Sequence, residues 1–432
     1  MTKKYIKFFN EIVYTDVPKV GGKNASLGEM YSKLHAKGIK VPNGFATTAE
    51  AYHDFIKSNQ LEILIKNILK NLDTKDVRDL AVRGAKIRQI ILNAKFPLDL
   101  EKQIIKGYYK LTGSHGVKHM DVAVRSSATS EDLPDASFAG QQETFLNIRG
   151  EKELLIAVKK CIASLFTNRA ISYRVDKNFD HLSIALSVGI QKMIRSDLAS
   201  SGVMFTIDTE SGFNNVVLIN SIYGLGENIV QGKVNPDEFY VFKPTGKILS
   251  QRIGTKQLRM IYTKDLKHPV RDIKVSAKES LKPSITNEQV IKLAKWGMII
   301  EKHYGCPMDI EWALDGIEKQ LYIIQARPET VQSVRNYNIL EEYKLNEPGK
   351  IIAKGQSVGN KIGAGIANRI MSIRDIAKFK PGQILVTETE LVMQRLFHVS
   401  SAFHALLAPR MAQKSSNKIN PLLLIVPKVK TA

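Results

Sequence analysis

Cysteines, long hydrophobic runs and internal repeats are scarce or absent in this sequence of 432 residues. The two cysteines, Cys161 and Cys306, lie far apart and fit neither a CxxC motif nor a metal-ligand spacing, which argues against a disulfide framework and a zinc site. The longest apolar run, Leu422 to Val426, is far too short to span a bilayer. The N-terminal segment lacks the apolar stretch of a signal peptide. We therefore expect a cytoplasmic protein with no membrane partner.

Acidic residues are outnumbered, since 42 Asp and Glu stand against 63 Lys and Arg and give a formal net charge of +21. Such a surplus can indicate nucleic-acid binding. The sequence contains no known nucleic-acid-binding module, and its basic residues are spread through predicted helices instead of being gathered in a tail. We therefore predict a basic surface that tolerates an anionic nucleotide, and no nucleic-acid partner. The chain is long enough for two or three domains with sizeable cores.

Apolar spacing predicts much of the secondary structure. Residues 51–110 carry apolar side chains at helical intervals, and residues 151–173 are typical of one further helix that ends in a basic turn near Arg174. Branched apolar residues over 181–194 predict a strand. A capping box begins a predicted helix over 286–304.

A long irregular segment follows a short predicted strand at Val122 and Val124, and order returns at Thr144. Such a segment is usually a binding loop or a lid. Arg125 stands at the end of the strand beside several hydroxyl side chains, and a guanidinium with hydroxyls suits phosphate oxygens. An ordinary polar surface loop is the alternative.

Two glycines at positions 21 and 22 precede Lys23 and a helical pattern. Backbone N–H groups and an ammonium at a helix N-terminus favour phosphate. The segment is not a Walker A motif, because GxxxxGK followed by Ser or Thr is absent from the whole chain. A simple turn is the alternative.

Residues 308–327 predict a hairpin with one polar face. Alternation in MDIEWALDG places Asp309 and Glu311 on the side opposite to the apolar residues, and the following strand LYIIQARP carries Gln325 and Arg327. Carboxylate and amide oxygens can hold Mg²⁺, and a guanidinium can brace a triphosphate. The alternative is a solvated polar face of a half-exposed sheet.

These three segments resemble the phosphoenolpyruvate synthase (pyruvate, water dikinase) family. The family's ATP-binding signature is nearly identical, residue for residue, to VAVRSSATSEDLPDASFAGQQETFLN. Closely related sequences occur in rifampicin phosphotransferase and in the wider pyruvate phosphate dikinase group. GGKNASLGEM with VPNGFATTAE resembles the start of the family's nucleotide domain, and IEW with QARPET resembles its end.

The resemblance implies an α+β chain with an ATP-grasp fold, in which two lobes enclose an ATP cleft, followed by an incomplete swivelling phosphohistidine domain. It implies a nucleotide-binding domain over 1–335, a linker over 336–354 and a partial phosphohistidine domain over 355–390. It also implies ATP and Mg²⁺ as bound groups, with Glu311 and Gln325 as metal ligands and Arg125 and Arg327 as catalytic phosphate contacts. Further nucleotide contacts are implied at Lys23, Gly140, Thr144 and Gln191.

The last 42 residues, 391–432, contain no Asp or Glu, whereas the chain's average content would place about four there. We expect this tail to be foreign to the family and to result from a frameshift near Glu390. The family's phosphohistidine motif, similar to GGRTCHAAI, is absent, so neither His398 nor His404 is expected to accept a phosphoryl group.

In the intact family enzyme, the resemblance implies that ATP, pyruvate and water become phosphoenolpyruvate, AMP and phosphate. The ATP-grasp domain passes a phosphoryl group to a histidine, which carries it to pyruvate on a barrel domain. We expect this chain to keep only the ATP-binding part, so that pyruvate is a partner of the intact enzyme alone, and the question of a homo-oligomer stays open. The alternatives are a rifampicin-phosphotransferase-like dikinase and a non-catalytic ATP-binding remnant.

Overall fold

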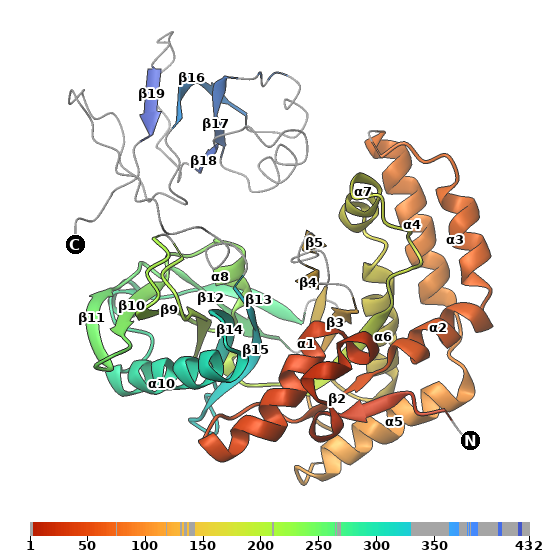
Figure 1. The fold of residues 1–432 in the computed structure, drawn as a ribbon, viewed down its shortest axis with the longest axis horizontal. Coiled ribbons are helices and arrows are strands. Elements are labelled where there is room, and N and C mark those ends of the chain that lie inside the picture. The colour runs from red at the N-terminus through yellow and green to blue at the C-terminus, as the bar shows by residue number, and fades with distance from the viewer. Residues whose placement is uncertain are drawn as a thin grey trace. The chain divides into compact units, whose positions relative to one another are not determined.

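The computed structural model describes residues 3–74, 76–117, 119–129, 132–133, 136–137, 143–209, 211–263, 265, 269–329, 363–370, 378, 380, 382–387, 405–407 and 422–425. The chain divides into two compact units, one made of Met1–Thr209 with Phe213–Val334 and one made of Glu210–Gly212 with Arg335–Ala432. Helices and sheets are both present, so the expected combination of α and β structure is confirmed (Figure 1).

The first unit contains a five-stranded antiparallel sheet in the order β1-β2-β7-β3-β6. Its strands are β1 (Ile6–Phe8), β2 (Gly44–Thr47), β3 (Val122–Ala128), β6 (Thr144–Ile148) and β7 (Leu186–Lys192). Two-residue strands β4 (Asp132–Leu133) and β5 (Ala136–Ser137) pair with each other between β3 and β6. Because side chains alternate along a strand, Val122 and Val124 lie in the core while Arg125 lies on the other face. The predicted strand at this position is confirmed.

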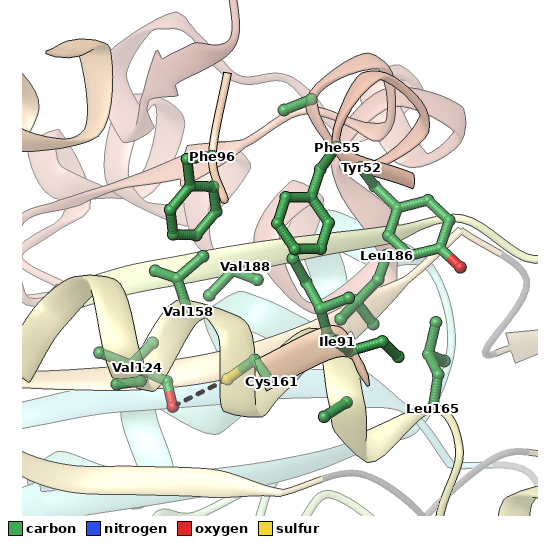
Figure 2. Packing of buried hydrophobic residues seen from close by; sticks show 14 of the residues in the cluster. Tyr52, Phe55, Ile91, Phe96, Val124, Val158, Cys161, Leu165, Leu186 and Val188 are labelled. Carbon is green, nitrogen blue, oxygen red and sulfur yellow. Dashed lines mark hydrogen bonds between the residues drawn. The ribbon is translucent and has the colours of Figure 1, made fainter. Parts of the chain in front are cut away.

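Helices cover the apolar face of this sheet (Figure 1). They are α2 (Ala49–Ser58), α3 (Leu61–Leu69), α4 (Val77–Asn93), α5 (Leu98–Gly113), α6 (Glu151–Ser164) and α7 (Asn168–Asp176). Figure 2 shows the core between them, where the Cys161 thiol donates a hydrogen bond to the Val124 carbonyl at 3.6 Å. Burial raises the pKa of this thiol, so Cys161 is a packing residue and not a reactive one.

The prediction of one helix over 151–173 is wrong, because α6 and α7 are separate. Thr167 caps the start of α7 by accepting a hydrogen bond from the Ala170 N–H, and this cap requires an extended backbone that ends the preceding helix. Arg174 does lie in the last turn of a helix, α7, and its side chain is fully buried. Its guanidinium donates to the Leu165 carbonyl at 2.6 Å and to His181 Nδ1 at 3.0 Å. The predicted strand over 181–194 is confirmed only over the shorter range of β7.

His181 makes the free energy of unfolding depend on pH. Burial, and then the charge of Arg174, lower the pKa of His181 to about 4, since the ring must stay neutral to accept the Arg174 hydrogen bond. In the unfolded chain this pKa is about 6.5, so the unfolded state binds more protons between these values and stability is lost as pH falls through this window. Urea unfolding at pH 7 and pH 4.5 should show wild type losing about 1–2 kcal/mol more than His181→Asn. Equal losses in both proteins would contradict this role.

The first unit also contains a six-stranded antiparallel sheet in the order β11-β10-β9-β8-β14-β15. Its strands are β8 (Ser200–Phe205), β9 (Val216–Tyr223), β10 (Asp237–Phe242), β11 (Lys247–Arg252), β14 (Met308–Leu314) and β15 (Leu321–Pro328). One face packs against α10 (Asn287–Tyr304), whose predicted capping box at Thr286 is confirmed. The helix ends at Gly305, which has a left-handed φ of 73°.

Short elements complete the first unit. A hairpin of β12 (Leu258–Tyr262) and β13 (Val270–Lys274) accompanies the short helices α8 (Glu227–Val230) and α9 (Ala277–Ser280). Single 3-10 turns occur at Phe9–Glu11, Tyr14–Asp16, His35–Lys37 and Ser196–Leu198. Within the ranges given above, no helix combines the length and apolar character needed to cross a membrane.

Helix α1 (Val17–Glu29) lies against both sheets and contacts β3, β7 and β15. It is broken at Gly21, which has a φ of 75°, and a Cβ there would lie 2.3 Å from Ser127 Oγ and 2.4 Å from the Ser127 carbonyl oxygen. Only glycine permits both this backbone conformation and this close approach. Further along, Ser26 Oγ donates to the Ala326 carbonyl on β15 at 2.8 Å. Helix α1 therefore holds the two sheets in a fixed relation, and it continues into a π-helical turn at Met30–Leu34.

The second unit contains a four-stranded sheet in the order β18-β17-β16-β19. Strands β16 (Gly363–Arg369), β17 (Gln383–Thr387) and β18 (Ala405–Leu407) pair in parallel, and β19 (Leu422–Ile425) pairs antiparallel to β16. Two of these strands come from the stretch that was expected to be foreign to the family. His398 and His404 lie outside the described residues.

Candidate functional site

Arg125 is the centre of a polar cluster that joins β3 to the β14–β15 hairpin. Its Nη2 atom donates to Glu311 Oε2 at 2.9 Å and to Gln325 Oε1 at 2.8 Å, and its Nη1 atom donates to the Ile324 carbonyl at 2.9 Å. The Arg125 side chain is 16% exposed and that of Glu311 is 28% exposed. Three residues that the sequence singled out thus meet, although Arg125 and Glu311 are separated by 186 positions.

A β-bulge in the hairpin produces this arrangement. Glu311 pairs with Gln325 and Trp312 pairs with Ile323, so the register assigns Ile324 no partner on β14. The extra residue lets Ile323 face the core while Gln325 faces Arg125, and the Ile324 carbonyl accepts from the guanidinium. Sequence reasoning missed the Ile324 carbonyl. The signal was the apolar pattern of β15, because buried Leu321, Ile323 and Ala326 cannot share one face of a regular strand.

A second ion pair lies on the same face of the hairpin. Asp309 and Arg327 are cross-strand partners; Arg327 Nε donates to Asp309 Oδ2 at 2.9 Å, and Arg327 Nη2 lies 2.7 Å from the same oxygen in an ion pair. Burial raises the pKa of the Asp309 carboxyl, and the Arg327 charge opposes this change. Asp309 therefore fixes the direction in which the Arg327 guanidinium is presented.

Lys23 enters the same region from α1, just after the break at Gly21. The Asn24 N–H donates to Ser127 Oγ on β3 at 3.3 Å, which holds this turn against the strand that carries Arg125. A small cavity is lined here by Phe9, Lys23, Asn24, Leu27, Arg125, Gly189, Gln191 and Gln325. The cavity is too small to hold a nucleotide, and Arg125 is one of the side chains that line it.

Gln191 and Thr144 lie on the strands that flank β3. Gln191 is 3% exposed near the end of β7, and its Nε2 atom donates to the Pro42 carbonyl at 3.5 Å. Thr144 begins β6 directly across from Arg125 and is exposed. Gly140 lies outside the described residues. The structure thus brings Lys23, Gln191 and Gln325 to one cavity with Arg125, joins Glu311 to it through Arg125, and places Arg327 two residues along the same strand from Gln325.

Glu227 on α8 is a further acidic residue near this cluster that sequence reasoning did not assign to the site. Burial raises the pKa of the Glu227 carboxyl, the charge of Glu311 adds to this increase, and Arg125 opposes it. Mutual electrostatic effects of this kind require proximity. The available signal was the glycine-rich turn at Gly224, just before α8. Gly224 has a left-handed φ of 81°, and a Cβ there would lie 2.5 Å from the Met260 carbonyl oxygen.

The cluster fits a magnesium ion that is bound together with phosphate. In the described part of the chain, no group of three or more His, Cys, Asp or Glu side chains could hold a metal alone. Glu311 Oε2 and Gln325 Oε1 nevertheless converge, because both lie within 3 Å of the single atom Arg125 Nη2. Mg²⁺ usually takes one or two protein oxygens and completes its shell with phosphate oxygens and water. Two converging oxygens beside three cationic side chains suit that arrangement.

Comparison with known proteins places this site in a family. The family described as "Pyruvate phosphate dikinase, AMP/ATP-binding domain" matches residues 17–347. Phosphoenolpyruvate synthase from Synechocystis sp. is 49% identical over 397 residues, which are 88% of this chain and 48% of the relative. The enzymes of the same name from Helicobacter pylori and Escherichia coli are 49% and 50% identical and cover 89% of this chain. The chain spans about half the length of these relatives.

Proposed function

Because the chain belongs to the pyruvate phosphate dikinase AMP/ATP-binding domain family, we propose that it is the ATP-binding part of a phosphoenolpyruvate synthase. Residues 1–335 form an ATP-grasp domain that binds ATP with Mg²⁺ and transfers a phosphoryl group from it. The complete reaction converts ATP, pyruvate and water into phosphoenolpyruvate, AMP and phosphate. Residues 336–354 are a linker, residues 355–390 are part of a phosphohistidine domain, and residues 391–432 are foreign to the family.

One observation carries this proposal, namely that Arg125 on one sheet meets Glu311 and Gln325 on the other. In an ATP-grasp domain the nucleotide lies between two lobes, and this cluster lies where the five-stranded and six-stranded sheets face each other across α1. Phosphoryl transfer is mainly positioning and neutralisation of charge. The site offers cations and oxygen ligands from three elements that are far apart in the sequence.

The residues divide between phosphate and metal. Lys23, Arg125 and Arg327 neutralise phosphate oxygens, and Asp309 keeps the Arg327 guanidinium in one orientation. Glu311 and Gln325 hold Mg²⁺, which supplies further neutralisation of the triphosphate when it is bound. The remaining contacts that position the nucleotide come from Gln191, Thr144 and Gly140.

The acceptor of the phosphoryl group is not among the residues assigned to this site. In the proposed scheme a histidine on a separate domain accepts the group and passes it to pyruvate. Because the chain spans about half of its relatives, the complete reaction requires the remaining parts of a full-length enzyme. ATP binding is the step that this chain can carry out alone.

Calorimetry of Mg·ATP binding tests the proposal. Wild type should bind with micromolar affinity, and Gln325→Ala should bind about 10- to 100-fold more weakly because one metal ligand is lost. When a chelator removes Mg²⁺, the affinities of wild type and Gln325→Ala for ATP should differ much less. Gln320→Ala is the matched control, since Gln320 lies in the hairpin turn and accepts a hydrogen bond from Lys40. A folded wild-type chain that binds no Mg·ATP would overturn the proposed function.

A further inference from the structure

A protein cation occupies the position between the two proposed metal ligands. The same atom, Arg125 Nη2, lies 2.9 Å from Glu311 Oε2 and 2.8 Å from Gln325 Oε1. The neighbouring Nη1 atom is held by the Ile324 carbonyl at 2.9 Å, so three oxygens from one hairpin surround the guanidinium. The Arg125 side chain is only 16% exposed, which shields these contacts from solvent.

We propose that Arg125 substitutes for the metal ion in the nucleotide-free chain and must leave before a divalent cation can bind. The metal then enters only together with the triphosphate, which attracts the guanidinium away from Glu311 and Gln325. This inference rests on the proposed function, because it concerns the regulation of the same site. It makes nucleotide and metal binding strongly cooperative.

The guanidinium and a metal ion exclude each other for two reasons. First, Mg²⁺ needs its oxygen ligands at about 2.0–2.1 Å, and an ion that close to Glu311 and Gln325 would lie within a few ångströms of the guanidinium, where like charges repel strongly. Second, the contacts of Nη2 already engage both proposed ligand oxygens. Glu311 is also neutralised by Arg125, so the site offers little net negative charge to a metal ion that arrives alone.

The triphosphate provides the guanidinium with better partners. Phosphate oxygens accept paired hydrogen bonds from Arg and carry more charge than Glu311 and Gln325 together. The Arg125 backbone is fixed between Thr144 on β6 and Gly189 on β7. A change of side-chain rotamer is therefore sufficient, and no strand has to move. The cavity beside Arg125 is too small to hold a nucleotide, which agrees with a movement of the Arg125 side chain when nucleotide enters.

Binding of Mn²⁺ without nucleotide tests this inference by electron paramagnetic resonance. Arg125→Met and Arg125→Gln should each bind Mn²⁺ at least tenfold more tightly than wild type, because Glu311 and Gln325 are released. Lys192→Met is the matched control, since it removes the same charge from an ion pair with Glu318 and should leave Mn²⁺ binding unchanged. Two neutral variants with different side chains keep the result interpretable if one of them folds poorly.

A second titration adds a non-hydrolysable ATP analogue. The analogue should increase the Mn²⁺ affinity of wild type at least tenfold more than that of either Arg125 variant, because only wild type must displace its own cation. Equal Mn²⁺ affinities in wild type and both variants, with Mg·ATP binding by wild type intact, would overturn this inference and leave the proposed function standing. A wild type that binds no Mg·ATP would overturn both.

Discussion

Replacing Lys23 and Arg327 together with alanine should reduce the affinity for Mg·ATP by roughly 10²- to 10⁴-fold. Each side chain is expected to make a charge-assisted hydrogen bond to phosphate, and the loss of one such bond costs about 1.5–3 kcal/mol. The two residues lie on different elements, α1 and β15, and full additivity of their losses gives the upper end of this range. A sum of about 3–6 kcal/mol corresponds to the stated range, since about 1.4 kcal/mol changes an affinity tenfold.

The control for this double variant removes one positive charge from α1 and one from the six-stranded sheet that contains β15. Lys19→Ala with Arg252→Ala is suitable, because Lys19 is an exposed residue of α1 paired with Asp16, and Arg252 is an exposed residue of β11 paired with Glu238. Calorimetry at fixed ionic strength should show less than a fivefold effect for this control, in line with the small energies of exposed ion pairs. If both double variants lost affinity equally, Lys23 and Arg327 would act only through the net charge of the chain.

The hairpin that carries the site could be predicted from local sequence. Strict alternation in β14 is enough to place Asp309 and Glu311 opposite the apolar residues, and the structure places them there. The capping box at Thr286 is equally local, and α10 begins where it predicts. Both features depend on residues within a few positions of each other, which is why the sequence alone is sufficient.

Features that depend on distant partners were missed. The bulge at Ile324 lets β15 place apolar residues in the core and still direct Gln325 toward Arg125. Arg174 was predicted only as part of a basic helix end, and the fold adds that its side chain is buried against Phe166. The meeting of Arg125 with the hairpin followed from family resemblance, since no local pattern relates positions 125 and 311.

The glycines at positions 21 and 22 show one feature that local sequence predicts and one that depends on a distant contact. The sequence predicts a turn before a helix, and α1 is indeed broken at Gly21. The reason that Gly21 in particular is required is its approach to Ser127 on β3, which leaves no room for a Cβ atom. This contact is long-range, so the sequence indicates the turn but not the constraint that positions Lys23 beside Arg125.

Removing one partner of the ion pair between Lys256 and Asp237 should cost more stability than removing one partner of any other pair in the described part of the chain. Both side chains are 0% exposed. Lys256 Nζ donates to Asp237 and to the carbonyls of Gly254 at 2.9 Å and Ser280 at 3.0 Å. Asp237 Oδ2 in turn accepts from the Ser284 N–H at 2.7 Å and its hydroxyl at 2.6 Å. The network fastens β10 to the segment that leads into α10.

Lys256→Met should therefore lower the free energy of unfolding by about 3–5 kcal/mol, because it leaves the Asp237 carboxylate buried without a cation. Urea unfolding followed by tryptophan fluorescence measures this, since Trp296 and Trp312 are buried in the same unit. Lys243→Met is the control, because Lys243 pairs with Glu301 at a partly exposed position and should cost about 1 kcal/mol or less.

A second variant separates loss of charge pairing from loss of packing. Adding Asp237→Asn to Lys256→Met removes the unpaired charge, so the double variant should be more stable than Lys256→Met alone even though it has lost another native group. If the double variant were the less stable of the two, the cost would come from the hydrogen bonds of Asp237 to Ser284 and Gly254 and not from a buried charge. The two side chains would then stabilise the fold mainly through their hydrogen bonds, and the attraction between their charges would contribute little to the free energy of unfolding.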